Sequence, residues 1–386
     1  MTIKISFRAM GVVAASALAL TACGTTNSNS SSGGTPTSGS GGSGCAHNIA
    51  FLGAATGPNG ALGQNMIGGI KLALSKYNAK HASAKVCLKT FDSQGDPAQA
   101  PALATKIVGD PTIIGLVGPG FSGESKATGA TFAAAGLPSI SASATNVTLT
   151  QRGWTTWHRV IGNDAAQGAA DAKYIKNTLK SNTVIVIDDG SDYGKGLATV
   201  VKTNLGSAVI STDTVTTGQT DFSATVSKVQ NSGANVLFYG GYYAESGLLA
   251  KQLRAAGWTG KFVSGDGSED PKFVSTAGAS AANGALLSAP AGPAPASFNK
   301  EYQALIGSPA GLYSTQAYDA TNIFLAAIAA GKTSHADVNS FINSYTGQGV
   351  SGPIAFDSKG DIKKSVIWMY TVKNGVLDVA HPTAIS

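Results

Sequence analysis

The sequence predicts an α/β protein built from two doubly wound, parallel-sheet lobes. Short β-rich runs alternate with helical stretches along the chain, which is typical of parallel strands connected by helices that cover both faces of a sheet. The β-rich runs are apolar at successive positions, as expected for strands buried on both faces. From Cys45 to Ser386 the chain is long enough for two lobes at roughly 100 to 200 residues each.

The alternation assigns the elements in order. In the first half the expected strands are 48–54, 86–92, 112–118 and 137–142, and the expected helices are 60–80, 98–108 and 122–135. In the second half the expected strands are 182–189, 234–241 and 260–266, and the expected helices are 193–205 and 245–256. Asp192 is expected to cap the helix that begins near Tyr193, because a short acidic side chain can accept a hydrogen bond from the first turn.

The pattern of residues 1–22 predicts a secretory signal peptide. Lys4 and Arg8 precede an uncharged apolar run that closes on small residues. The segment Leu20-Thr21-Ala22-Cys23 resembles the lipobox of bacterial lipoproteins, in which the cysteine is lipidated and becomes the first mature residue. Ordinary cleavage near Ala22 is the alternative, and a membrane-spanning helix is disfavoured because the run is shorter than about 20 residues.

Residues 23–44 are expected to form the lipidated cysteine and a flexible linker. The segment after Cys23 is rich in Ser, Gly, Thr and Asn and has almost nothing to bury. A chain of this composition and length behaves as a coil that reaches on the order of 25 Å. The predicted localisation is therefore extracytoplasmic, with the folded part held to the cell membrane by its lipid anchor only.

The charge distribution argues against a nucleic-acid partner. The chain carries 27 basic and 21 acidic residues. Without Lys4 and Arg8, 25 basic residues remain against 21 acidic ones, a net charge of +4. This excess is scattered, with no run of Lys or Arg that could follow a phosphate backbone.

Cys45 and Cys87 are expected to form a disulfide. An even pair of cysteines outside the cytoplasm favours a bridge, and both lie in or beside predicted strands of the first lobe. Two unpaired thiols are the alternative, as is metal binding, although no His or third Cys stands at ligand spacing.

The segments that follow the predicted strands are expected to line the binding site. In open α/β sheets a ligand lies outside the carboxyl ends of the strands. These segments are 53–64, 118–125, 141–146, 188–196, 240–247 and 264–271. They are rich in Gly, Ser and Thr, which offer backbone N–H groups and hydroxyls rather than a catalytic set.

Gly118, Gly120 and Gly123 form a G-x-G-x-x-G pattern after a predicted strand and before a predicted helix. A dinucleotide site also needs an acidic residue about 20 positions later, and none occurs between Glu124 and Asp164. A small anion such as a carboxylate at the helix N-terminus remains as an interpretation, as does a purely structural turn.

No catalytic set emerges, so the protein is not expected to be an enzyme. Ser122 lacks the glycine two residues later that a hydrolase nucleophile elbow requires. Asp188, Asp189 and Asp192 lack calcium-loop spacing. The five histidines, at positions 47, 81, 158, 335 and 381, lie far apart. Neither a cofactor nor a metal site is predicted.

Seven motifs in order resemble the branched-chain amino-acid (leucine/isoleucine/valine) substrate-binding proteins of ABC importers, here in lipoprotein form. They are GPNGALGQNMIGGIKLA, SISASATNVTLTQRG, GNDAAQGAADAKYI, DYGKGLA, FYGGYYAESGLLAKQLRAAG, QAYDATNIFLAAI and GPIAFDSKGDIK. The resemblance implies the type I periplasmic-binding fold, two lobes joined by three crossings that close on a ligand. It places the first lobe at 45–163 and 288–350, and the second at 164–287 and 351–386.

The resemblance also implies the ligand site. Ser122, Ser143 and Thr145 match positions that hold the carboxylate of an amino acid, beside Gly120 of the glycine-rich turn. Tyr242 and Asp266 match positions that receive its ammonium. The family's acid is commonly Glu and its first-loop position is often Tyr, whereas this chain has Asp266 and Leu62.

The implied function is capture of a small amino acid, branched-chain above all, and its delivery to the membrane permease of an ABC importer by a monomeric protein. A binder of an amide, urea or aromatic acid on the same fold is the alternative, and a ligand-sensing lipoprotein is another.

Overall fold

The computed structural model describes residues 44–386. The predicted signal peptide, the lipidation site Cys23 and linker residues 24–43 lie outside the described residues. No helix within residues 44–386 is both long and apolar enough to cross a bilayer.

The first sheet has five strands that all run parallel, in the order β2-β1-β3-β4-β5. They are β1 (Cys45–Gly53), β2 (Lys85–Asp92), β3 (Ile113–Val117), β4 (Ser139–Ser141) and β5 (Trp157–Arg159). The connecting helices are α1 (Gly60–Lys80), α2 (Ala100–Val108), α3 (Ser122–Ala134) and the 3-10 helix η1 (Val147–Gln151). The predicted strands and helices of this half are therefore confirmed, and β5 is an addition.

The second sheet is mixed and follows the order β14-β13-β10-β9-β8-β6-β7, with β15 paired to β13. Its parallel strands are β6 (Val184–Asp188), β7 (Val209–Thr214), β8 (Val236–Gly240), β9 (Lys261–Ser264) and β10 (Leu286–Ala289). Its antiparallel strands are β13 (Trp368–Lys373), β14 (Val376–Leu377) and β15 (Thr383–Ala384). The antiparallel edge was not predicted.

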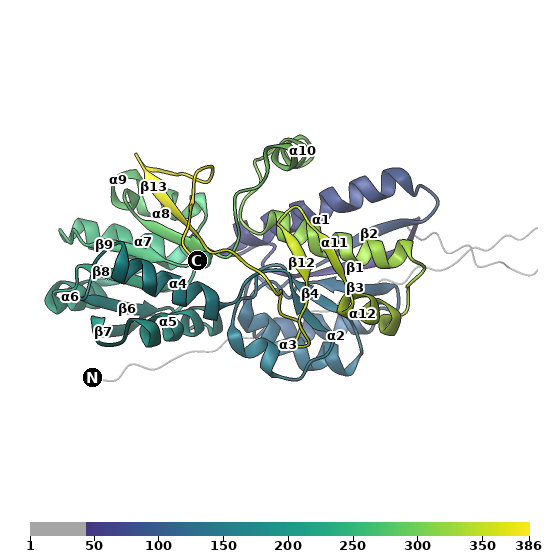
Figure 1. The fold of residues 1–386 in the computed structure, drawn as a ribbon, viewed down its shortest axis with the longest axis horizontal. Coiled ribbons are helices and arrows are strands. Elements are labelled where there is room, and N and C mark those ends of the chain that lie inside the picture. Colours follow the sequence, from purple (N-terminus) through teal and green to yellow (C-terminus); the bar gives the residue numbers. More distant parts are fainter. Residues whose placement is uncertain (1–43) are drawn as a thin grey trace, which may run out of the picture. The chain divides into compact units, whose positions relative to one another are not determined.

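Helices cover both faces of the second sheet. They are α4 (Asp164–Asn177), α5 (Asp192–Leu205), α6 (Ser223–Ser232), α7 (Tyr243–Ala255), α8 (Pro271–Ala277) and α9 (Ala279–Ala282), with the 3-10 helices η2 (Gly206–Ala208) and η3 (Asp266–Ser268). Helix α4 packs on α5, and α7 packs on α8. Figure 1 shows this group of helices in teal and green around its sheet.

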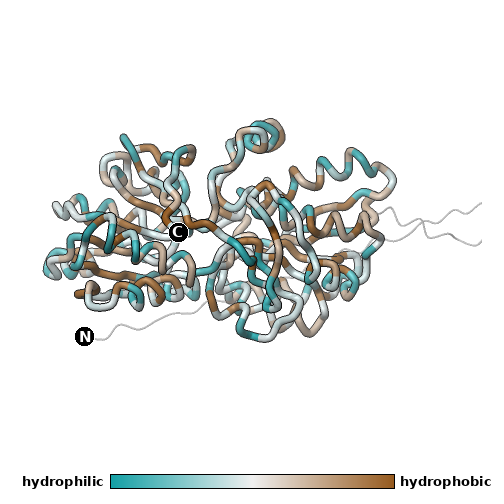
Figure 2. The backbone as a smooth tube through the Cα atoms, viewed as in Figure 1, coloured by the Kyte–Doolittle hydropathy of each residue, from teal (hydrophilic) through white to brown (hydrophobic). Residues whose placement is uncertain are grey.

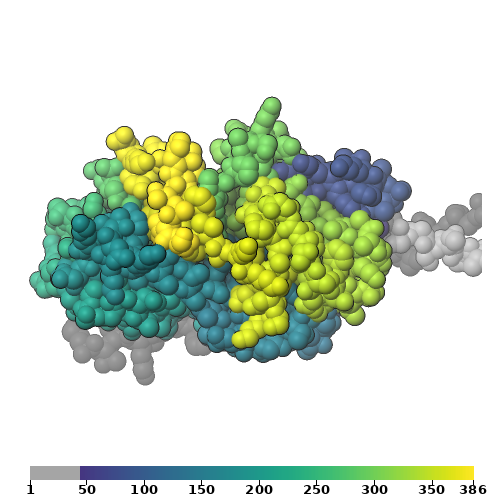
Figure 3. Space-filling view, in the orientation of Figure 1, coloured from purple at the N-terminus to yellow at the C-terminus, as the bar shows by residue number. Residues whose placement is uncertain are grey.

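The chain passes between the two sheets three times. The first passage leads from β5 to α4, and the second leads from β10 to α10 (Ala296–Ile306). The third leads from the hairpin of β11 (Thr346–Gln348) and β12 (Pro353–Ala355) to β13. Figure 3 shows this last segment, in yellow, at the surface.

Two further helices complete the half that contains the first sheet. Helix α11 (Ser314–Ala329) packs along α1, and α12 (His335–Asn343) packs on α11 and β3. We call the first sheet with α1–α3 and α10–α12 the first lobe, and the second sheet with α4–α9 the second lobe. The predicted boundary at 287/288 falls within β10, and the residue boundaries of the lobes stay a prediction.

The core consists of the central strands, which are buried on both faces. Every residue of β3 and of β8 is buried, and so are the last six residues of β1. Figure 2 shows these segments as brown, apolar stretches inside each lobe. Each fully buried large apolar side chain stabilises the fold by about 1.5–3 kcal/mol, so these strands hold the loops at their ends in fixed positions.

The predicted disulfide is present. Cys45 in β1 and Cys87 in β2 are bridged, with their Cα atoms 5.8 Å apart. The two strands run parallel in adjacent positions of the first sheet, which brings the cysteines together although they stand 42 residues apart.

The predicted helix cap at Asp192 is wrong. Ser191 is the N-cap of α5, because its side chain accepts a hydrogen bond from the amide of Gly194 at 2.9 Å. Asp192 lies one position inside the helix and instead forms an ion pair with Lys126 of α3 at 2.6 Å. The residue that was assigned to a local cap therefore links the two lobes.

Candidate functional site

The candidate site lies where the carboxyl ends of strands from both sheets meet. In the first lobe the segments after β3 and β4 carry Ser122, Ser143 and Thr145, all of them buried. In the second lobe the segments after β8 and β9 carry Tyr242 and Asp266, which are buried as well. Contacts between the lobes include a hydrogen bond from Asn146 Nδ2 to the carbonyl of Asp192 at 2.6 Å.

The segments after β3 and β4 are bonded to each other. The amide of Asn146 donates to Ser122 Oγ at 3.2 Å, and the Ser143 hydroxyl donates to the carbonyl of Gly120 at 2.5 Å. Ser122 accepts in its contact and keeps its hydroxyl proton for another partner. Ser143 already uses its proton within the protein, so its hydroxyl is a poorer donor to a ligand than that of Ser122.

Thr145 is the unsatisfied member of this group. Its hydroxyl is fully buried and has no hydrogen-bond partner among residues 44–386. Its amide is likewise unpaired within the described chain, while its carbonyl accepts from the amide of Asp164 at 2.9 Å. A buried donor without a partner costs free energy, about 1–3 kcal/mol, unless something else accepts from it.

Gly120 and Leu62, the other two predicted ligand residues of the first lobe, make contacts within that lobe. The amide of Gly120 donates to the carbonyl of Leu52 at 2.8 Å, and a Cβ at Gly120 would approach Glu124 Oε2 to 3.3 Å. Leu62 lies in the first turn of α1 rather than in a loop, and its side chain is completely buried in the hydrophobic core with Met66. The ligand-binding roles of both residues stay predictions.

Asp266 is held by two phenols at the start of η3. Its Oδ1 accepts from the Tyr193 hydroxyl at 2.7 Å, and its Oδ2 accepts from the Tyr313 hydroxyl at 2.5 Å. Tyr313 lies at the start of α11 in the first lobe, so this carboxylate is shared between the lobes. Burial raises the pKa of Asp266, and the two phenols oppose that rise.

Tyr242 stands at the N-cap position of α7 and has aromatic neighbours from both lobes. The centroid of its ring is 4.7 Å from that of Phe121 and 5.1 Å from that of Tyr193. Burial raises the pKa of its hydroxyl well above the ordinary value, so the phenol stays protonated. These three rings form an apolar wall beside Ser122 and Asp266.

Asp164 is a candidate site residue that the sequence reasoning missed. It is the first residue of α4, it is completely buried, and neither carboxylate oxygen has a hydrogen-bond partner in the described part of the chain. Burial raises its pKa to about 7, and the nearby charge of Asp266 adds to the rise. The Thr145 hydroxyl lies close enough to oppose that rise, although it makes no well-formed hydrogen bond.

A third buried carboxyl group, that of Asp171, lies near Asp164 and Asp266. Asp171 is fully buried about two turns after Asp164 in α4, and its Oδ2 accepts from the Ser288 hydroxyl at 3.0 Å. Burial raises the pKa of Asp171 well above its ordinary value, and the charges of Asp266 and Asp164 contribute. The nearby cation, Arg159, is engaged in an ion pair with Asp361. The second-lobe side of the site is therefore rich in carboxyl groups that no ion pair within residues 44–386 engages.

A cavity of about 650 Å³ opens beside the aromatic wall and is lined from both lobes. Phe121 and Gly123 contribute from the first lobe, and Asp189, Ser191 and Tyr242 contribute from the second. Tyr242 is the predicted ligand residue that reaches this cavity. Ser122, Ser143, Thr145 and Asp266 do not line this cavity, and Asp164 lies close to both Thr145 and Asp266.

The polar groups at this interface suit a small zwitterion. The first lobe offers hydroxyl and amide donors at the N-terminus of α3 and in the 143–146 segment, which favour an anion. The second lobe offers carboxylates, which favour a cation. Among residues 44–386, no cluster of three His, Cys, Asp or Glu side chains is placed to hold a metal ion.

The chain matches the family model described as periplasmic binding protein over residues 47–376. It is 33% identical over 326 residues to the leucine-specific-binding protein of Salmonella typhimurium, an alignment that covers 82% of this chain and 88% of that protein. It is 30% identical over 324 residues to the Leu/Ile/Val-binding protein of Escherichia coli, with 82% and 88% covered.

A solved structure is similar over the same region. It is the branched-chain amino acid transporter substrate binding protein of Streptococcus pneumoniae in complex with isoleucine, which shares 26% of residues with this chain. The superposition has a TM-score of 0.81 and covers 88% of this chain and 99% of that protein.

Proposed function

This chain belongs to the periplasmic binding protein family, in its branched-chain amino-acid branch, and on that premise we propose that it is an extracytoplasmic solute-binding protein of an ABC importer. It captures a small amino acid, branched-chain above all, between its two lobes and delivers it to the membrane permease. The relatives' names, which specify leucine, isoleucine and valine, support this ligand class.

One observation carries the proposal at the level of this chain's own residues. Buried donors without partners, at Thr145, lie close to buried carboxylates without a paired cation, at Asp164 and Asp266. A zwitterion satisfies both sets at once, because its carboxylate accepts from the donors and its ammonium donates to the acids. A neutral amide, urea or a simple acid leaves the buried carboxylates uncompensated, which is costly.

In the proposed arrangement Ser122 and Thr145 hold the carboxylate, and the N-terminus of α3 adds its partial positive charge. Asp266 receives the ammonium, with Asp164 as a second acceptor. Tyr242, which the resemblance assigns to the ammonium together with Asp266, also presents with its aromatic neighbours the apolar surface that a branched side chain needs. This division makes the ligand a link between the lobes, so that binding favours their closure.

The test is calorimetric titration of the purified protein with matched ligands. Leucine, isoleucine and valine are compared with 4-methylpentanoate, which lacks the ammonium, and with leucinol, which lacks the carboxylate. We expect saturable binding of a branched-chain amino acid at one ligand per chain and much weaker binding of both analogues. Tight binding of 4-methylpentanoate, benzoate or urea in place of the amino acids contradicts the proposal.

Two further features of the proposal concern the cell rather than the site. We propose that the mature protein is anchored through lipid on Cys23, because that cysteine ends the lipobox-like segment. We also propose that it acts as a monomer. A Cys23→Ala variant is expected to be released in folded form into the soluble extracytoplasmic fraction. Continued fractionation of that variant with the membrane argues against the anchor.

A further inference from the structure

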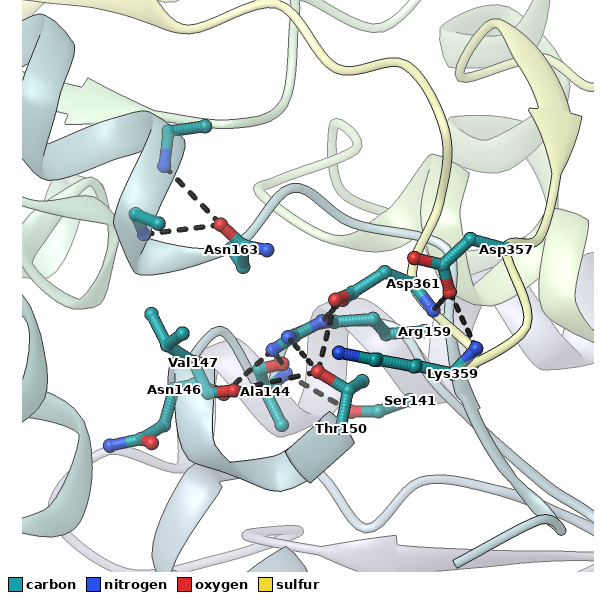
Figure 4. A network of polar contacts seen from close by, with 12 residues as sticks. Ser141, Ala144, Asn146, Val147, Thr150, Arg159, Asn163, Asp357, Lys359 and Asp361 are labelled. Atoms are coloured by element: carbon teal, nitrogen blue, oxygen red, sulfur yellow. Dashed lines mark hydrogen bonds and ion pairs between the residues drawn. The ribbon is translucent and has the colours of Figure 1, made fainter. Parts of the chain in front are cut away.

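A single buried arginine organises the segment that carries Thr145. Arg159, the last residue of β5, is completely buried. Its Nη1 donates to the carbonyl of Ala144 at 3.1 Å and to the carbonyl of Asn146 at 2.9 Å. Figure 4 shows the guanidinium against these two carbonyls, which flank Thr145 on either side.

The other side of the guanidinium is fixed by the third passage between the lobes. Arg159 Nε pairs with Asp361 Oδ1 at 2.5 Å, and Thr150 donates to Asp361 Oδ2 at 3.0 Å. The amide of Arg159 also donates to the carbonyl of Gly360 at 3.0 Å. Asp361 is itself held in a turn by Asp357, whose Oδ1 accepts from its amide at 3.0 Å. The arginine therefore cannot turn away without breaking several bonds.

The peptide geometry determines what this contact does to Thr145. A trans peptide unit is planar, so the carbonyl of Ala144 and the amide of Thr145 point in opposite directions. When Arg159 holds the carbonyl on its own side, the amide of Thr145 is directed away from the guanidinium. Neither that amide nor the Thr145 hydroxyl has a hydrogen-bond partner within residues 44–386.

We propose that Arg159, held by Asp361, is a positioning residue that sets the Thr145 donors toward the ligand carboxylate. This inference rests on the proposed function, since it assumes a ligand with a carboxylate at that place. Arg159 does not touch the ligand in this arrangement. It acts through the 144–146 backbone, and it makes the carboxylate-binding segment depend on the third passage between the lobes.

The test is the ratio of two dissociation constants, for leucine and for leucinol, measured by calorimetry on the full folded protein. Arg159→Gln removes the charge-assisted bonds to both carbonyls. Bonds of that kind contribute about 1.5–3 kcal/mol, so we expect leucine to bind roughly 10- to 100-fold more weakly. Leucinol lacks the carboxylate, and its affinity should change less than about threefold because the ammonium side is untouched.

Asp361→Asn is measured in parallel because its side chain is only partly buried, 19% exposed, and its amide oxygen can still accept from Arg159. It should shift the leucine-to-leucinol ratio in the same direction but less. Arg152→Gln is the control, since Arg152 is exposed and its guanidinium lies 5.4 Å from the ring of Trp154. The control should leave the ratio unchanged.

An unchanged ratio in both Arg159→Gln and Asp361→Asn overturns the inference, even when the variants melt at lower temperature, because a purely structural role weakens both ligands alike. Failure of the proposed function has a different signature. In that case the wild-type protein itself shows no preference for leucine over leucinol.

Discussion

The two halves of the candidate site differ in the chemical groups that they offer to a ligand. The first lobe uses neutral groups, and most of them are already bonded within the protein, as Ser143 is to Gly120. The second lobe uses carboxylates that have been taken out of water, as Asp164 and Asp266 have. Neutral donors can be buried at modest cost, whereas unpaired charges cannot. The acidic half therefore depends more strongly on a ligand to complete it.

Two buried acids, one in each lobe, illustrate this difference between the lobes, because the pKa of each is raised to a similar value. Burial raises the pKa of Glu124 in the first lobe and of Asp164 in the second to about 7. Glu124 has partners, because Ser93 Oγ donates to one oxygen and the amide of Phe121 donates to the other at 2.6 Å. Asp164 has none within residues 44–386. The partners, rather than the pKa, distinguish a structural acid from a site acid.

Loss of the Asp266 carboxylate should have the largest effect on binding. In Asp266→Ala the buried ligand ammonium loses its main acceptor and keeps only Asp164, and removal of one partner from a buried charge pair costs about 3–5 kcal/mol. That cost corresponds to a loss of about a hundredfold to a few thousandfold in affinity for leucine. Calorimetry measures it, and circular dichroism should show an intact fold. Wild-type affinity in this variant contradicts the assignment of Asp266.

Asp164→Asn should have the second-largest effect and tests the acid that sequence reasoning missed. It removes one charged acceptor without changing the size of the side chain. We expect leucine to bind about 10- to 100-fold more weakly, since a hydrogen bond to a charged group contributes about 1.5–3 kcal/mol. The unliganded variant should melt at the same or a higher temperature, because an unpaired buried charge has been removed. Unchanged affinity would mean that Asp164 does not face the ligand.

The fold could be predicted from the sequence because its signals are local. Buried strands such as β3 and β8 are continuous apolar runs, and each is visible without knowledge of its neighbours. The antiparallel strand β13 was missed because pairing with β10 depends on segments more than 70 residues apart along the chain. For Asp192 and Ser191, composition favours both as caps, and only the backbone geometry at the start of α5 decides between them.

The sequence predicted only those residues of the candidate site that stand in a recognisable motif. Thr145, Tyr242 and Asp266 follow strands, and a family pattern marks them. The bond from Tyr313 to Asp266 joins residues 47 positions apart and lies outside any local pattern. Asp164 was noted only as the end of a stretch without acids, because its burial and lack of partners depend on how the lobes pack. The ligand roles of the predicted residues stay predictions.

The affinity for leucine should also depend on pH, because Asp164 titrates near neutral pH. This effect should be smaller than that of the Asp266→Ala substitution. Below pH 7 the unliganded protein keeps a proton on Asp164, because its pKa is about 7, and an ammonium ligand must displace that proton. Affinity for leucine should therefore rise by about tenfold between pH 6 and pH 8. The charged and titratable groups around this carboxyl are Asp266, Asp171, Tyr193, Tyr242 and Arg159.

Calorimetric titrations of the protein with leucine between pH 6 and pH 8, in buffers of different ionisation enthalpy, would also measure the proton that is released on binding. The Asp164→Asn variant is the control and should show a flatter profile. Affinity for leucine that falls as the pH rises from 6 to 8 contradicts this account of the acidic half.

Glu124→Gln should have the smallest effect on binding and a clear effect on stability. Glu124 closes the start of α3 and is bonded on both oxygens, so its replacement should change affinity for leucine by less than about threefold. Its folded-state pKa of about 7 lies above the ordinary value of 4.5 for a glutamate. The folded protein therefore binds a proton more tightly than the unfolded chain, and the contribution of Glu124 to stability is lost as the pH rises from about 4.5 to about 7. That loss is on the order of 3 kcal/mol at most.

A glutamine stays neutral, so the variant should lose less stability than the wild type over this pH range, as measured by urea unfolding at pH 5 and pH 7.5. Asp164→Asn should flatten the same stability profile, because the pKa of Asp164 is raised in the same way. The two variants should then share a flatter stability profile and differ in their affinity for leucine, which Asp164→Asn weakens and Glu124→Gln preserves. If Glu124→Gln weakens leucine binding as much as Asp164→Asn does, the hydrogen bonds that Glu124 accepts within the protein do not distinguish a structural acid from a ligand-binding acid. The proposed difference between the two lobes is then wrong.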